Sequence, residues 1–411
     1  MNKAKNFKGT GTFLALLLMI SLIFILTADI KAAYVSNSFK SRYVFNTEED
    51  TTYKFPLIYE VNYEKKIKTD NIFGELNITP QFKYDLESEK EDIELKEAFL
   101  DLYLSDFDLR LGKQKVTWGK SDGLIVTNIV NSRDYTVHPV LEFIDQMQAV
   151  NAVKTNFYPE KGNLELVWIP EFKPAAIDKS LLAKKIPAGF KKDPSQKEIE
   201  TEPGNSELFM RYSVLGDNFD YELMAGYSWS DTPTLHKNFK KKTVIPQHHR
   251  LVTVGGSFST MEGPFVFRGE GAYISGKYFN LESPLSHLSK YPDGIIERDE
   301  IKWLAGIDYN YEGYLFSTQF MQEAVMDYKE GIIQNEYNNK LTFLVQKDFW
   351  RQTLNTEINF HYDLNEEILM AKPSLSYNYA DSINIKAGAN LNLERKKKKK
   401  DVVYLQTEYI F

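Results

Sequence analysis

From Ser38 onward, apolar and polar side chains alternate along the chain in segments of about 9 to 13 residues. The stretches 53–63, 219–229 and 383–393 are clear examples, each with apolar residues at every second position. A period of two predicts β-strands that have one apolar and one mainly polar face. These segments are longer than typical strands of soluble sheets, and their length suits a tilted strand that crosses a bilayer.

The connections between these segments alternate in length. Short turns such as 216–218 and 312–313 alternate along the chain with long polar stretches such as 170–205 and 276–299. This order is typical of an outer-membrane barrel, which has tight periplasmic turns and extended outer loops. We therefore predict an all-β fold in which residues 33–411 form a transmembrane antiparallel β-barrel.

The number of strands follows from the same pattern. About 17 segments are clear, and a single-chain bacterial barrel is expected to have an even number. We assign the missing strand to residues 39–45, where Phe39, Tyr43 and Phe45 share one face. The prediction is about 18 strands, with 16 as the alternative. A barrel of either size is wide enough to leave an aqueous channel.

Both chain ends carry signals of export. Lys3, Lys5 and Lys8 precede an apolar run over 12–26, and small residues follow up to Ala32. This pattern predicts a signal peptide over 1–32, with an uncleaved anchor as the alternative. The last segment ends on Phe411 and resembles the terminal strand that bacterial outer-membrane barrels present to their assembly machinery. The expected location is the outer membrane of a Gram-negative-type (diderm) bacterium.

The composition of the chain excludes several kinds of site and partner. The chain has no cysteine, which excludes disulfides and Cys-ligated metals, and its net charge of -7 argues against a nucleic-acid partner. None of the six histidines lies in a G-x-S-x-G or H-E-x-x-H motif. We therefore expect no enzyme activity, no catalytic residues, no cofactor and no metal site.

If the apolar faces meet lipid, the alternate positions line the lumen, where water removes most of the cost of burying charge. Because the lining carries both signs, we expect weak ion selectivity, and some of these groups could simply pair across strands. The predicted lumen residues are Lys54, Glu60, Glu97, Asp101, Arg110, Arg211, Glu222, Arg268, Glu270, Lys302, Asp308, Glu357, His361, Asn384 and Lys386.

One connection, 119–148, is unusually long and rich in turn signals, and such connections are usually functional. Val140, Phe143, Ile144 and Met147 have the spacing of a short amphipathic helix. We expect 119–148 to fold into the lumen and narrow the pore, the alternative being a cap outside the barrel. The constriction candidates in this connection are Asp122, Asn131, Arg133 and Asp134, which join Glu97, Asp101, Arg110, Arg211, Arg268 and Glu270 from the strands.

The start of this connection carries a motif. The motif G-[RK]-Q-x-x-x-W-G-x-x-D-G is matched by Gly112, Lys113, Gln114, Trp118, Gly119, Asp122 and Gly123. A second segment that follows it is matched by Asn128, Ile129, Asn131 and Asp134. In this respect the chain resembles a porin-like family of outer-membrane barrels of unassigned function, in which Ser132 is usually proline. Alginate-export-type porins look like more distant relatives. The resemblance implies a barrel and a channel.

The function expected from the sequence is passive diffusion of small hydrophilic solutes through an outer-membrane channel. The alternative is a surface or adhesion barrel with a closed lumen, whose loops bind an external partner. The expected partners are outer-membrane lipid, the barrel assembly machinery and small hydrophilic solutes.

Overall fold

The computed structural model describes residues 33–47, 51–69, 72–120, 123–124, 126–136, 143–178, 182–183, 185–193, 198–282, 290–393 and 401–411. The predicted signal peptide and the predicted site residue Asp122 lie outside these ranges. No helix among the described residues is long and apolar enough to cross a membrane.

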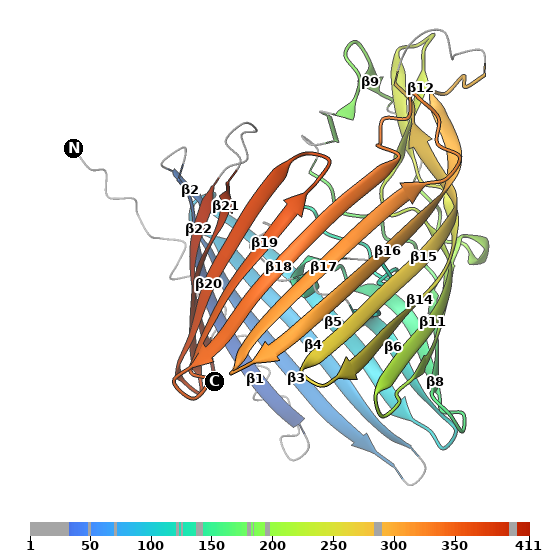
Figure 1. Cartoon of the computed structure of the whole chain (residues 1–411). Helices are drawn as coiled ribbons and strands as arrows, with labels where there is room; N and C mark the ends of the chain where they lie inside the picture. The colour runs from blue at the N-terminus through green and yellow to red at the C-terminus, as the bar shows by residue number, and fades with distance from the viewer. Residues whose placement is uncertain are drawn as a thin grey trace.

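A single antiparallel sheet closes on itself into a barrel (Figure 1), because β1 pairs with β3 on one side and with β22 on the other. β2 and β3 both pair with β1 and form two parts of one strand, so the 19 strands of the sheet make an 18-strand barrel, as the sequence predicted. The strands are β1 (Ala33–Asn46), β2 (Thr51–Lys54), β3 (Pro56–Lys68), β4 (Phe73–Asp85), β5 (Lys90–Tyr103), β6 (Phe107–Gln114), β7 (Val150–Phe157), β8 (Asn163–Ile169), β10 (Glu207–Val214), β11 (Phe219–Trp229), β14 (Arg250–Glu262), β15 (Phe265–Asn280), β16 (Ile295–Tyr311), β17 (Tyr314–Val325), β18 (Tyr337–Phe349), β19 (Leu354–Asp363), β20 (Ile368–Ala380), β21 (Ile383–Asn392) and β22 (Val402–Ile410).

The two faces of the barrel wall differ as the alternation predicted. Outward-facing side chains are large and apolar yet exposed, such as Leu223 at 58% and Trp303 at 38%. Their neighbours Glu222 and Leu304 point inward and are buried. A continuous exposed apolar wall is stable only against lipid, and closure leaves no unpaired strand edge. The wall therefore spans a membrane and contacts its lipid.

The two ends of the barrel are unlike. Turns such as 312–313 and 381–382 close one end, where the C-terminus also lies (Figure 1). At the other end β9 (Lys191–Lys192), β12 (Thr234–Asn238) and β13 (Thr243–Gln247) form a small separate sheet above the barrel. Short turns face the periplasm in outer-membrane barrels, so we name the two ends periplasmic and outer.

The connection between β6 and β7 lies inside the barrel. We use the name inward segment for its described residues, 115–120, 123–124, 126–136 and 143–148. Its buried side chains, Val116, Trp118, Val126 and Val130, pack in one cluster with inward-facing side chains of β7, β8, β10, β11, β15, β16 and β17. These wall residues are Val150, Ala152, Val167, Ile169, Phe209, Met224, Ala272, Leu304 and Met321.

The predicted short helix is described only in part. Residues 137–142 lie outside the described ranges, and Phe143–Gln146 forms a single 3-10 turn, η2. Met147 is buried at its end.

Candidate functional site

The inward segment leaves the wall where β6 ends. Gly112 has a φ of +127°, and a Cβ on it would lie 2.3 Å from the carbonyl oxygen of Ala98, so the neighbouring backbone requires glycine here. The fully buried side chain of Gln114 then donates from Nε2 to the Ala152 carbonyl at 3.1 Å. This bond holds the last residue of β6 to β7 while the chain turns into the lumen.

Asn131 joins the two halves of the segment. Its Oδ1 accepts a hydrogen bond from the Val116 N–H at 2.7 Å, and its Nδ2 donates to the Gln148 carbonyl at 2.7 Å. Asn131 is buried, so both bonds are shielded from water. One side chain thus fixes the beginning of the segment against its end.

Glu270 on β15 is the main anchor of the segment. Its carboxylate accepts hydrogen bonds from the backbone N–H of Lys120 at 2.6 Å, the backbone N–H of Thr127 at 3.1 Å and the Thr127 hydroxyl at 2.9 Å. Gly119 permits this approach, because a Cβ there would lie 2.5 Å from Thr127 Oγ1 and 2.8 Å from Glu270 Oε1.

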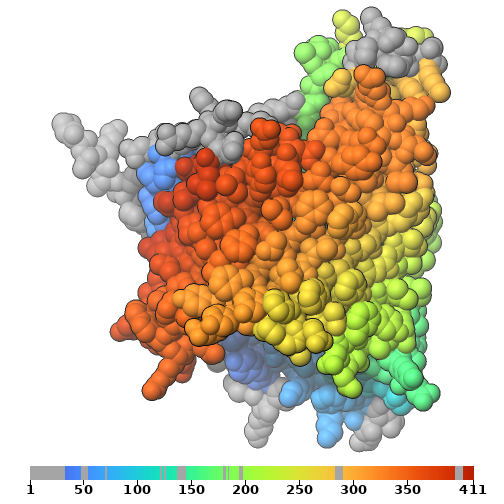
Figure 2. All heavy atoms as spheres, in the orientation of Figure 1, coloured from blue at the N-terminus to red at the C-terminus, as the bar shows by residue number. Residues whose placement is uncertain are grey.

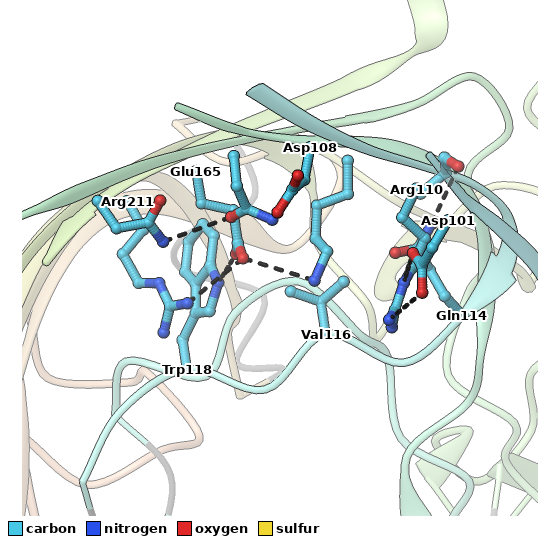
Figure 3. A network of polar contacts seen from close by, with 12 residues as sticks. Asp101, Asp108, Arg110, Gln114, Val116, Trp118, Glu165 and Arg211 are labelled. Atoms are coloured by element: carbon cyan, nitrogen blue, oxygen red, sulfur yellow. Dashed lines mark hydrogen bonds and ion pairs between the residues drawn. The ribbon is translucent and has the colours of Figure 1, made fainter. Parts of the chain in front are cut away.

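Glu165 on β8 is a second anchor. It is 3% exposed and accepts a hydrogen bond from the Trp118 indole Nε1–H at 2.5 Å. Arg211 and Lys154 balance its charge, with nitrogens 3.4 Å and 3.6 Å from Oε2. Figure 3 shows Trp118 and Arg211 converging on Glu165. The indole ring also packs edge-on against Phe209, which fixes its orientation.

Two further wall carboxylates contact the segment. Glu97 on β5 accepts from the Lys115 N–H at 2.8 Å. Glu222 on β11 accepts from the Gly119 N–H at 3.4 Å, and its Oε1 lies 3.5 Å from Lys120 Nζ. Four carboxylates from four strands therefore hold one segment, mostly through its backbone. Hydrogen bonds to ionised acceptors are stronger than neutral ones, so these contacts favour one fixed position.

Two arginines of the wall form close pairs with carboxylates. Arg110 makes a two-pronged contact with Asp101 at 2.7 and 2.8 Å, seen at the right of Figure 3, and its guanidinium stacks on the Phe99 ring. Arg268 pairs with Asp308 and also donates to the Lys120 carbonyl at 3.0 Å. Arg268 thus touches the segment, whereas the contacts of Arg110 lie on β5.

Arg133 and Asp134 lie at the turn where the segment folds back. Arg133 donates to Gln146 Oε1 at 2.6 Å, and Asp134 Oδ1 accepts from the Thr136 N–H at 2.8 Å. Asp134 also bridges to Ala176 in the connection after β8. These contacts stabilise the turn itself, and Arg133 in addition lines the cavity above the segment.

The inward side chains of the far wall, opposite the inward segment, are less buried. Glu357, His361, Asn384 and Lys386 on β19 and β21 point inward, as predicted, and all four are half-buried. The inward residues beneath the segment, such as Glu165, are closed off by contrast. The segment therefore fills one side of the lumen, while inward polar groups on the other side remain accessible to water.

Above the segment, two adjoining cavities of about 340 Å³ and 580 Å³ form an outer vestibule. They share Tyr135, Asp231 and Lys302, and Lys302 pairs with Glu323 at 2.7 Å. The vestibule leads from the outer loops down to Asn131 and Arg133 of the segment.

Comparison with solved structures identifies the architecture. OpdK, an outer membrane protein from Pseudomonas aeruginosa, matches with a TM-score of 0.58 and 9% identity, over 92% of this chain and 98% of that chain. OccK5 (OpdH) from the same organism matches at 0.57 and 11%, over 93% and 98%. OccAB4 from Acinetobacter baumannii matches at 0.56 and 12%, over 93% and 98%. The fold is that of an outer-membrane porin. No family model and no curated protein sequence matches the chain, so the motif-based and alginate-export resemblances stay predictions.

Most site residues predicted from the sequence lie on the inner face of this porin fold. Glu97, Glu270, Arg268, Arg211 and Asn131 come together in or around the inward segment, whereas Asp101 and Arg110 form a pair of their own. Their role in pore lining or constriction stays a prediction.

Sequence reasoning missed Glu165 and Lys154 as lumen residues. Glu165 alternates with Val167 and Ile169 on one face of β8, so a single carboxylate on an otherwise apolar face was the available signal. A tryptophan near the end of a membrane strand commonly lies in the interfacial belt, but Trp118, the partner of that carboxylate, is buried inside the barrel.

The histidines of the outer region form a small cluster. The Nε2 atoms of His236 and His249 lie 2.9 Å apart, and Asp293 lies 3.7 Å from His236 Nδ1. Burial and, to a smaller extent, the neighbouring His236 and His248 together lower the pKa of His249 to about 4. Burial also lowers the pKa of His236, against the attraction of Asp293. Among the described residues, no group of three or more His, Asp or Glu side chains is placed to hold a metal ion.

Proposed function

We propose that this chain is an outer-membrane channel through which small hydrophilic solutes diffuse passively, in a diderm bacterium. The observation that carries the proposal is the half-filled lumen. The inward segment is anchored to one wall, and the inward polar groups of the opposite wall, from Glu357 to Lys386, remain half-exposed. A closed barrel would bury both sides and pair their charges.

The segment sets the width of the proposed passage. Its anchors are wall carboxylates that bind backbone N–H groups, and Glu270 alone accepts two of them. Rigid anchoring suits a constriction that must keep its diameter while solutes pass. The outer vestibule, with Tyr135 and Lys302, supplies the entrance.

Small organic acids are one class of solute to test. One of the structures that share this fold is OpdK with vanillate, a small aromatic carboxylate. In this chain the vestibule is lined by Tyr135, by Lys340 and by Lys302, whose ammonium pairs with Glu323 and Glu300. These groups support the entry of a small carboxylate, and the balanced charges beneath them also suit neutral solutes.

The experiment is reconstitution of the refolded barrel in planar bilayers. We expect discrete conductance steps, and we expect larger steps after deletion of residues 124–146. Heat-modifiable migration in detergent gels controls for folding. A folded barrel without conductance steps would refute the channel and leave the closed adhesion barrel. Steps of unchanged size after the deletion would refute the constriction.

We also propose that export uses residues 1–32 and that assembly uses the last strand. β22 joins β21 to β1, and Phe411 exchanges backbone hydrogen bonds with Asn37 at 2.9 Å. The aromatic end is thus part of the seam that closes the barrel. Deleting Phe411 is expected to lower the amount of barrel assembled in cells more than the yield of refolding in detergent.

A further inference from the structure

A groove of about 500 Å³ runs along the outward face of the barrel near its periplasmic end. Small residues form its floor, namely Pro373, Ala387 and Ala389, and larger side chains such as Leu375 and Phe349 form its rims. Leu375 stands out from the wall at 52% exposure. Strands β17 to β20, which carry much of the groove, turn their outward face to the viewer in Figure 2.

The sequence explains why the wall is hollowed here. Pro373 has no N–H to donate, and the pairing of β20 with β21 lapses between Ala371–Leu391 and Ser374–Gly388. Alanine on the neighbouring strand adds little bulk. Other residues of the groove, such as Leu375, Phe349 and Tyr314, carry larger side chains, so this stretch is lower than its surroundings.

A single cation lies at the periplasmic end of the groove. Lys347 shares the outward face of β18 with Leu341 and Phe343, and its Nζ lies 3.5 Å from the centre of the Tyr314 ring and 5.6 Å from that of Phe349. Its one hydrogen bond is a long one, 3.4 Å, to the Glu312 carbonyl in a periplasmic turn. No described carboxylate forms an ion pair with it.

We propose that this groove binds a glycerophospholipid of the periplasmic leaflet, with an acyl chain along the small-residue floor and the phosphate on Lys347 Nζ. A lysine on a lipid-facing wall is costly unless its ammonium reaches the headgroup region. The Tyr314 and Phe349 rings belong to the aromatic belt that marks this region, and they hold the ammonium where phosphates lie. The Lys347 ammonium, which has no ion-pair partner among the described residues, suits the lipid phosphate, and the apolar floor beside it suits an acyl chain.

The site is independent of conduction, because it lies on the outside of the wall. A second copy of the chain is the competing occupant, since a hollow apolar face could also pack against another barrel. Lys347 argues against that occupant, because a second apolar wall would bury an unpaired ammonium.

Native mass spectrometry of the full mature barrel in detergent, titrated with phosphatidylglycerol, tests the proposal. Wild type should retain one more lipid than Lys347→Gln or Ala387→Leu at equal lipid concentration. Loss of one lysine–phosphate contact at a membrane surface should weaken this binding about fivefold. The matched controls are Lys161→Gln, in another periplasmic turn, and Ala305→Leu, on the exposed outward face of β16.

The results of this titration distinguish a bound lipid from a second copy of the chain. Equal lipid retention by wild type, both groove variants and both controls overturns the proposal. An oligomer in wild type that Ala387→Leu converts to a monomer, without change in lipid count, assigns the groove to a second copy and also overturns it. Heat-modifiable migration of each variant verifies that the barrel has folded.

Discussion

Replacing Glu270 should release the inward segment while leaving the barrel intact. The carboxylate is buried on β15 and binds the segment at two points seven residues apart, Lys120 and Thr127. In Glu270→Ala, two backbone N–H groups and one hydroxyl lose their acceptor. The wall itself keeps its backbone pairing, because β15 remains bonded to β14 and β16.

The size of the effect follows from these contacts. A hydrogen bond to a charged group contributes about 1.5–3 kcal/mol, and an unsatisfied buried donor costs about 1–3 kcal/mol. Because water enters a vacated site and such contacts are not additive, we take about 3 kcal/mol for the whole change. That shifts the balance between docked and undocked segment on the order of a hundredfold. Glu270→Gln keeps one acceptor oxygen and should cost less.

Two assays report on the segment. Single-channel recordings of Glu270→Ala should show larger steps and more open-channel noise than wild type. Trypsin cannot enter a barrel of this width, so cleavage after Lys120 measures how often the segment leaves the lumen. The matched control is Glu408→Ala, which removes a carboxylate paired with Lys40 at 3.1 Å on the far wall.

The reasoning is refuted if Glu270→Ala and Glu408→Ala give the same conductance, the same noise and the same resistance to trypsin. That result would mean that the other three carboxylates and the apolar cluster hold the segment without Glu270.

Three further results are expected. Gly119→Ala should disorder the segment and raise trypsin cleavage, because the φ is +92° and a Cβ would lie 2.5 Å from the nearest side-chain oxygen; unchanged cleavage would contradict this. Trp118→Phe keeps an aromatic ring but removes the indole donor to Glu165, so stability should fall by about 1–3 kcal/mol, seen as a lower unfolding temperature in detergent. Trp303→Phe, on the exposed outer face, is the control. Because the pKa of His249 is lowered to about 4, its neutral ring stabilises the small sheet of β9, β12 and β13. This contribution is fully present above pH 6.5 and is lost as the pH falls towards 4. Hydrogen exchange of residues 234–247, corrected for intrinsic rates, should therefore rise between pH 7 and pH 4.5 relative to the periplasmic turns.

The barrel could be predicted because the alternation of apolar and polar residues along each strand shows which face of the strand meets lipid. Apolar residues recur at about every second position in most of the 18 segments, and neither tertiary contact nor partner is needed to see it. One exception lies above the membrane. β16 begins at Ile295, although the regular alternation starts only at Ile301, because β15 and β16 continue beyond the barrel around a buried cluster that includes Phe279 and Ile296. A register shift after Ile274, where Gly276 has a φ of +84°, interrupts the alternation there.

The inner face was predictable, but the pairing on it was not. The strand alternation places Glu270 and Arg268 on the inner face, where water or protein must satisfy their hydrogen bonds, but it does not predict which of the two does so. Glu270 meets Lys120 across 150 positions of sequence, and that contact depends on the path of a turn-rich segment whose backbone has no period. Glu165 was missed because one carboxylate on an apolar face gives no partner, and its partner Trp118 suits a membrane interface equally well.

The same contacts bear on selectivity. Near the segment the cations are matched by carboxylates: Arg110 by Asp101, Arg268 by Asp308, and Arg211 by Glu165 and Glu222. Glu270 binds mainly N–H dipoles, which also offset its charge. Paired charges at short distance produce little field beyond a Debye length of about 8 Å, so the narrow part of the lumen should discriminate weakly between ions. In the outer vestibule Lys302 is likewise paired, with Glu323 and Glu300, and Lys340 lines the same cavity. Substitution of Lys340 should therefore change ion preference more than substitution of the anchoring carboxylates.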